Sequence, residues 1–286
     1  LRALNARLLG GDTTLDGSIG VDGALRLSAQ GTVTAEALRN AAQPADLARI
    51  GALLRGQAAW RGTLALANGQ PELVLQSNLV GMQIDLPPPL AKVAAATPLP
   101  LRLQIAALPD PGAKGRDSLQ FELGDLLKAQ FQRDLSGPAP RVQRGSIAVL
   151  DTLPPLPAAG VQAALNLGRV DLDAWQALAE RSGAPSEPVA GGYLPQSLQL
   201  RADELRSGSR FLSNVRATLS SQGPATDAWW KASLVADQLA GDIEYRPARG
   251  NAQAGRVMAR LQRLAVPQSE VSTVETLLSQ PPASVP

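Results

Sequence analysis

The sequence predicts a mainly β protein whose strands form a long antiparallel sheet. Many short segments alternate apolar and polar residues with a period of two, as strands do when one face is buried and the other meets water. Gly-containing turns such as Asn68-Gly69 separate such segments and are typical of tight hairpins. Helical patterns are few. These three observations together favour a serial antiparallel meander.

The residues expected to face inward along the strands are nearly all aliphatic. They occupy every second position, so each strand has one apolar and one polar side. These positions are Leu25, Leu27, Leu64, Leu66, Leu73, Leu75, Leu101, Leu103, Ile105, Ile147, Val149, Leu165, Leu167, Leu198, Leu200, Val215, Ala217, Leu219, Ala232, Leu234 and Ala236. A second sheet, helices or a ligand must cover such an apolar face.

Two short helices are predicted between residues 34 and 55, and a third over residues 171–181. Pro44 interrupts the first stretch, and Asp46 is expected to be the N-cap of its second half. Asp171 or Asp173 is expected to cap the third helix. These helices are too few to cover so many strands, so they resemble plugs or crossovers. The options that remain are a sandwich closed on itself and a bent sheet with an open groove.

Prolines are concentrated in two segments that must leave the sheet, Asp85–Lys92 and Leu153–Pro157. Proline donates no ladder hydrogen bond and disfavours helix at the residue before it, so both segments are expected to be stiff connectors. Recognition by an SH3-type partner is the alternative. We expect a first β segment over residues 1–168, a second over 169–267 that continues the same sheet, and a disordered tail over 268–286.

The composition excludes several functions. The chain has 286 residues, 27 basic against 25 acidic side chains, and no Cys or His. The basic residues are scattered among acids, so we expect no nucleic-acid partner. The absence of Cys removes disulfides, thiolate metal sites and Cys nucleophiles, and the absence of His removes the commonest general base. We therefore expect no metal and no cofactor.

No group of residues predicts catalysis. Helix capping accounts for Asp171 and Asp173, while the adjacent Asp203 and Glu204 are expected to point to opposite faces of a strand. A hydrolase would need a Ser and a Lys, or two carboxylates, to converge in a pocket. We therefore expect that the protein is not an enzyme.

The chain carries no signal sequence and no apolar run long enough to span a membrane. It also begins at Leu1 without an initiating Met. We therefore expect a segment of a longer protein, with any signal or anchor upstream.

Several motifs follow one another in a recognisable order. They are Gly56-Gln-Ala-Ala-Trp-Arg-Gly-Thr-Leu-Ala-Leu66, Leu75-Gln-Ser-Asn-Leu-Val-Gly-Met-Gln-Ile-Asp-Leu-Pro-Pro-Pro-Leu-Ala-Lys92, Pro98-Leu-Pro-Leu101, Val170-Asp-Leu-Asp-Ala-Trp175, the Leu198–Leu205 strand, Trp230 with its following strand, and Arg256-Val-Met-Ala-Arg-Leu-Gln-Arg-Leu264. This order resembles the C-terminal portion of AsmA-like proteins of the YhdP branch. The stretch Leu86–Lys92 is the most specific piece.

The resemblance implies a segment of a bacterial envelope protein of the bridge type, which carries lipid between membranes and supports the permeability barrier. It implies a long, curved, taco-like sheet with an apolar concave face, a periplasmic location, and an inner-membrane anchor upstream. The implied partners are phospholipid acyl chains and the rest of the full-length chain. The expected groove lining is Leu64, Leu66, Leu73, Leu75, Leu101, Leu103, Ile105, Ile147, Val149, Leu165, Leu167, Leu198, Leu200, Leu219 and Leu234. A non-catalytic structural or interaction module of the cell envelope is the alternative.

Overall fold

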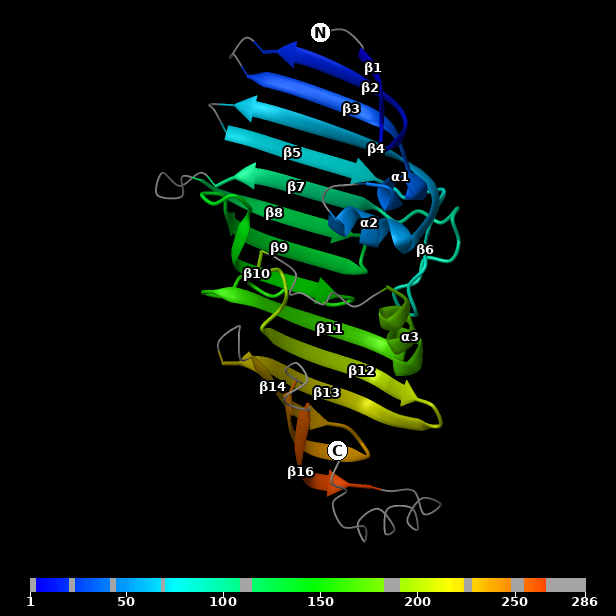
Figure 1. Cartoon of the computed structure of the whole chain (residues 1–286), viewed down its shortest axis with the longest axis vertical. Coiled ribbons are helices and arrows are strands. Elements are labelled where there is room, and N and C mark those ends of the chain that lie inside the picture. Colours follow the sequence, from blue (N-terminus) through cyan, green and yellow to red (C-terminus); the bar gives the residue numbers. More distant parts are fainter. Residues whose placement is uncertain are drawn as a thin grey trace.

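The computed structural model describes residues 4–20, 24–41, 45–67, 70–108, 115–182, 191–223, 228–247 and 255–265. In these ranges the chain forms sixteen strands and three short helices (Figure 1). The strands are β1 (Leu4–Leu8), β2 (Gly10–Ile19), β3 (Leu25–Thr34), β4 (Leu54–Ala67), β5 (Gln70–Ser77), β6 (Met82–Ile84), β7 (Leu101–Ala107), β8 (Arg116–Leu123), β9 (Leu127–Asp134), β10 (Arg141–Val149), β11 (Gly160–Asp171), β12 (Ser197–Ser207), β13 (Arg210–Gln222), β14 (Trp229–Val235), β15 (Leu239–Arg246) and β16 (Arg256–Leu264). The helices are α1 (Ala35–Arg39), α2 (Ala45–Ala52) and α3 (Leu172–Ser182).

The strands form one open sheet that follows the chain from β1 at one edge to β16 at the other. Only β6 lies off this path, where it pairs with the first residues of β4. The mainly β fold class is therefore confirmed. The predicted boundary after residue 168 falls inside β11, through which the sheet continues. The predicted tail and the Asn68-Gly69 turn lie outside the described residues.

The sheet departs from the predicted meander in its middle. β11 runs parallel to both β10 and β12, whereas the other pairs are antiparallel. The reason for the first parallel pair is the proline-rich connector after β10, which returns along the sheet before β11 begins. Its Pro155 carbonyl accepts hydrogen bonds from Ser146 Oγ at 3.0 Å and Gln162 Nε2 at 2.5 Å. The second parallel pair is connected through α3.

The three helices form where they were predicted, and side-chain caps define two of their starts. Thr34 Oγ1 accepts a hydrogen bond from Ala37 N and caps α1. Asp171 Oδ1 accepts from Asp173 N and Ala174 N and caps α3. The prediction that Asp46 is an N-cap is wrong, because α2 begins one residue earlier, at Ala45.

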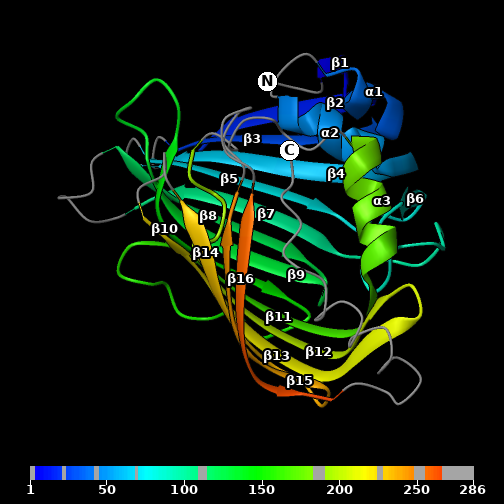
Figure 2. The same cartoon turned by 60° about the horizontal axis from the view of Figure 1, so that its bottom comes forward.

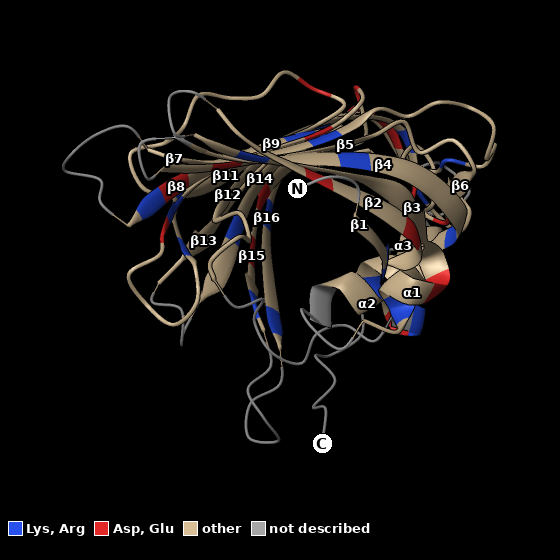
Figure 3. Cartoon of the chain, turned by 90° about the horizontal axis from the view of Figure 1, so that it is seen from above, with Lys and Arg blue, Asp and Glu red and all other residues tan. Residues whose placement is uncertain are grey.

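The sheet is bent into a trough. Figure 2 shows β12 and β13 turning upward near α3, and Figure 3 shows the sheet from above as an arch with α1 and α2 at its opening. Because α1 and α2 lie there, they mark the concave side of the sheet, which we call the inner face. Lys and Arg positions are interspersed with Asp and Glu along the strands (Figure 3).

Buried apolar residues gather in three small clusters, not in one core. The first joins Ala35 of α1 to Leu54 and Ala58 of β4 and to Met82 and Ile84 of β6. The second lies on β8–β11, and the third on β12, β13 and the residue after β14. Much of the remaining apolar surface is consequently only half-buried or exposed.

Candidate functional site: the apolar inner face of the sheet

A single row of apolar residues crosses the sheet from β2 to β16. In each strand the residue of this row is the direct cross-strand partner of the next, so the row is set by the strand register. The row consists of Leu15, Ala29, Gly62, Leu75, Leu103, Phe121, Ala129, Ile147, Ala163, Leu198, Leu219, Ala232, Ile243 and Ala259. We call it the central row. It contains no charged or polar side chain.

Two further rows flank the central row at a spacing of two residues. On one side the row is Leu27, Leu64, Leu73, Ile105, Leu119, Phe131, Gly145 and Val161. On the other side it is Gly31, Trp60, Ser77, Leu101, Leu123, Leu127, Val149, Leu165, Leu200, Ala217, Leu234, Gly241 and Leu261. Because side chains alternate along a strand, all three rows share one face.

This shared face is the concave one. Ala58, Leu101 and Leu123 belong to it by register, and they pack in the cluster that contains Ala35 of α1. Figure 3 shows α1 and α2 on the concave side of the arched sheet. The three rows therefore form the floor of the trough.

The register places all of the predicted lining residues on this one face. Leu75, Leu103, Ile147, Leu198 and Leu219 fall in the central row. The other predicted positions fall in the flanking rows or one step beyond them, and these are Leu64, Leu66, Leu73, Leu101, Ile105, Val149, Leu165, Leu167, Leu200 and Leu234.

The floor is open to solvent over part of its length. Leu64 is 38% exposed and Leu66 is 41% exposed, and Ile19 near the same strand ends is 76% exposed. Most other floor residues are half-buried. A wide apolar surface of this kind is uncommon on a protein without a binding role.

Sequence reasoning missed the floor residues contributed by β8 and β9. Leu119, Phe121 and Leu123 alternate regularly, so the signal was present in the sequence. In β9, Ala129 and Phe131 continue the floor, but Arg133 follows at the next inward position and obscures the pattern.

Arg133 and Asp117 form a charged pair on the inner face, beside its flanking row. Both are buried and face each other across β8 and β9. Arg133 Nη1 also donates to Tyr193 Oη at 3.2 Å, and the Tyr193 ring makes an edge contact with Phe131. Hydrogen bonding to the Asp117 carboxylate is the main cause that raises the pKa of Arg133. Arg133 thus remains charged, and through Tyr193 it fixes the segment before β12 to the inner face.

An aligned irregularity bends β11, β12 and β13. Leu205 and Leu212 pack with Ala202 and Val215, so inward positions here are three residues apart instead of two. The register is the same on both sides of this point, so neither strand of a pair has an extra residue relative to the other. Asn214, which lies between the two inward positions of β13, has a φ of 52°. Figure 2 shows β12 and β13 turning upward near α3.

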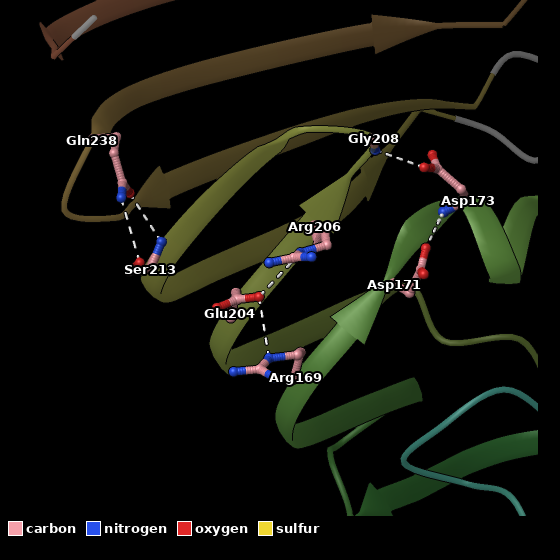
Figure 4. Close-up of polar contacts among 8 residues, drawn as sticks. All are labelled: Arg169, Asp171, Asp173, Glu204, Arg206, Gly208, Ser213 and Gln238. Atoms are coloured by element: carbon pink, nitrogen blue, oxygen red, sulfur yellow. Dashed lines mark hydrogen bonds and ion pairs between the residues drawn. The ribbon is translucent and has the colours of Figure 1, made fainter. Parts of the chain in front are cut away.

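Polar contacts surround this bend (Figure 4). Glu204 Oε1 lies 3.1 Å from Arg169 Nε and 3.4 Å from Arg206 Nε, as ionic contacts without hydrogen-bond geometry. Both arginines are exposed, so these pairs add little stability. Asp173 accepts hydrogen bonds from Gly208 N and Ser207 Oγ and ties α3 to the β12–β13 turn.

The last strands carry aromatic residues on both faces. Trp230 and Tyr245 are cross-strand partners that extend the inner face beyond the central row. Trp229 points to the opposite face, where the Arg246 guanidinium lies 5.3 Å from its ring centre. This contact has cation–π geometry.

The described residues contain no group of three or more acidic side chains that could hold a metal ion. None of their helices is long and apolar enough to cross a membrane.

Comparison with known proteins places the chain in a family. A family model described as YhdP protein matches residues 1–285, nearly the whole chain. No curated protein and no solved structure matches. The chain belongs to the YhdP family.

Proposed function

We propose that this chain is a segment of a periplasmic lipid-binding groove that shields phospholipid acyl chains during transport between the inner and outer membranes. The observation that carries the proposal is the central row, an uninterrupted apolar line across the trough floor. Membership of the YhdP family supports a lipid-related role in the cell envelope.

The dimensions of the floor suit acyl chains. Neighbouring strands lie about 4.8 Å apart, so the central row from β2 to β16 follows a path of roughly 60 Å along the sheet. Its two flanking rows give the floor a width of several residues along each strand. Acyl chains laid across the strands would then contact mainly apolar side chains.

The hydrophobic driving force for lipid binding to the floor does not depend on the identity of the lipid. Burial of an acyl chain gains about 0.8 kcal/mol for each CH₂ group, so a diacyl lipid needs no dedicated polar site to be retained. A uniform apolar floor also offers no deep energy minimum that would hold a lipid in one place. Retention without a deep energy minimum is what a path for moving lipids requires, whereas a storage site would hold a lipid in one place.

The proposal includes a location and partners. The segment would lie in the periplasm, anchored to the inner membrane through a part of the protein outside this chain. The remainder of that longer protein would continue the groove at the open edges, β1 and β16. We infer no catalytic role, since the sequence has neither His nor Cys and the central row carries no charged or polar side chain.

Native mass spectrometry of the chain, expressed in a bacterium and purified without detergent, tests the proposal. We expect mass additions that match phospholipids and that disappear after delipidation. Repeated preparations free of phospholipid, from a folded protein, would contradict it. That result would favour the alternative, a non-catalytic structural or interaction module, for which the two open sheet edges would supply the contact surfaces.

A further inference from the structure

A recess on the protein opens mainly on the outer face, opposite the apolar floor, and Gly31, Trp60, Ser77 and Leu101 of the floor's flanking row also border it. It has a volume of about 940 Å³ and lies across β2, β3, β4, β5, β7 and β8. A smaller recess of about 230 Å³ shares Thr14, Gln30, Arg61 and Gln76 with it. Lipid binding by the inner face would not involve the outer-face side chains of these two recesses.

A ladder of long polar side chains forms the base of the larger recess. Gln30, Arg61, Gln76, Arg102 and Glu122 are consecutive cross-strand partners, one from each of five neighbouring strands. They alternate with the floor residues along each strand, which assigns them to the outer face. The register thus holds an amide, a cation, an amide, a cation and an anion in a line, one step of about 4.8 Å apart.

Most of this ladder has unused hydrogen-bonding capacity. Within the described ranges, the side chains of Gln30, Arg61, Gln76 and Glu122 have no hydrogen-bond or ion-pair partner. Arg102 donates one hydrogen bond to Gln104 Oε1 and keeps further N–H groups. Amides, guanidinium groups and carboxylates together offer both donors and acceptors.

The charge of the larger recess is balanced. Arg61 and Arg102 are matched by Asp12 and Glu122 among its lining residues. A neutral recess does not favour a polyanion such as a nucleic acid, which needs an excess of cations. It suits an uncharged ligand whose groups both donate and accept hydrogen bonds, and hydroxyl groups have this property.

We infer that the outer-face ladder binds an extended, neutral oligosaccharide that runs across the strands. The strand spacing is close to the length of one pyranose in a β-1,4-linked chain, so each sugar would meet one ladder residue. An extended peptide rises only about 3.3 Å per residue and falls out of step with the ladder.

Saturation-transfer NMR and calorimetry with a β-1,4-linked N-acetylglucosamine hexamer test this inference. We expect saturable binding to the wild-type chain. The double variant Arg61→Ala with Gln76→Ala should weaken it by about tenfold or more, as expected for two lost hydrogen bonds. The matched control is Gln199→Ala with Thr218→Ala, which lies in the same outer-face row but outside both recesses and should bind like the wild type.

Three results would overturn the inference. They are failure of the hexamer to saturate the wild-type chain, equal affinity of the ladder variant and the wild type, and binding of a neutral Gln/Ser hexapeptide in place of the sugar. Circular dichroism verifies that the ladder variant is folded. Phospholipid content is measured on the same samples. Because phospholipid is expected on the opposite face, this measurement tests the proposed lipid binding independently of sugar binding.

Discussion

Arg133 Nε donates a hydrogen bond to Asp117 Oδ1 at 2.8 Å, and Arg133 Nη2 donates a second one to the other carboxylate oxygen. The Arg133 side chain is only 10% exposed and that of Asp117 only 6%. A two-point pair of this kind matches the planar guanidinium to the carboxylate and fixes both in orientation. The pair therefore joins β8 to β9 on the inner face. Through its hydrogen bond to Tyr193, Arg133 also positions that ring against these strands.

Removal of one partner should be costly. We expect Arg133→Met to lower the free energy of unfolding by about 3–5 kcal/mol, because the Asp117 carboxylate would remain buried without a counter-ion. Urea unfolding at neutral pH measures the change. The double variant Asp117→Leu with Arg133→Met should recover most of the loss, since it leaves no buried charge. Similar stability of the single and double variants would contradict this explanation.

A second buried cation organises the segment after β5. The Lys92 ammonium is buried and donates to the carbonyls of Met82 at 2.5 Å, Ala94 at 3.0 Å and Ala95 at 3.1 Å. We expect Lys92→Met to lower the free energy of unfolding by about 1–3 kcal/mol, because these carbonyls lose their donor. The exposed Lys231→Met should stay within about 0.5 kcal/mol of the wild type. An equal effect of both substitutions in urea unfolding would refute the role of Lys92.

Acid should loosen the contact between α3 and the β12–β13 turn. The hydrogen bond from Gly208 N, followed by that from Ser207 Oγ, lowers the pKa of Asp173 below its ordinary value of 3.8. Because the folded-state pKa is the lower one, the contribution of Asp173 to stability is fully present above 3.8. It is lost as the pH falls through the folded-state value. In a carboxyl NMR titration, Asp173 should become protonated at a lower pH than an ordinary exposed aspartate. The substitution Asp173→Asn should remove this part of the acid sensitivity. Titration at or above 3.8 would show that the contact is absent.

A charge on the trough floor should reduce lipid binding. Leu64 and Thr63 are adjacent, exposed residues of β4 that face the inner and outer sides respectively. We expect Leu64→Lys to lower the amount of bound phospholipid by about tenfold, because an ammonium group would have to be desolvated against acyl chains. Thr63→Lys adds the same charge to the outer face and should retain wild-type phospholipid. Equal loss in both variants, by quantitative lipid extraction, would point to a general charge effect.

Period-two alternation was enough to predict the fold class and the inward side of many strands. Leu101, Leu103 and Ile105 illustrate why, since a pure alternation of aliphatic and polar residues allows only one register with the apolar side buried. The short helices were also predictable, because Pro44 interrupts the first helical stretch of the sequence and the Asp171 cap marks the start of α3.

Other features depend on contacts that no local pattern carries. The parallel course of β11 follows from the path of the connector through Pro155. Arg133 looks like an outward residue until its partner Asp117, sixteen positions earlier, is known. The outer-face ladder likewise exists only because the register of five strands aligns side chains such as Arg61 and Gln76.

Photo-crosslinking at two adjacent positions of β7 tests the central claim most directly. Leu103 lies in the central row, and Gln104 lies on the outer face of the same strand. With p-benzoylphenylalanine at either position, irradiation of bacterial cells that express the chain should produce a phospholipid adduct at 103 and none at 104, as detected by mass spectrometry of the purified chain. Adducts at both positions to the same extent, or at 104 alone, would contradict a lipid path along the inner face.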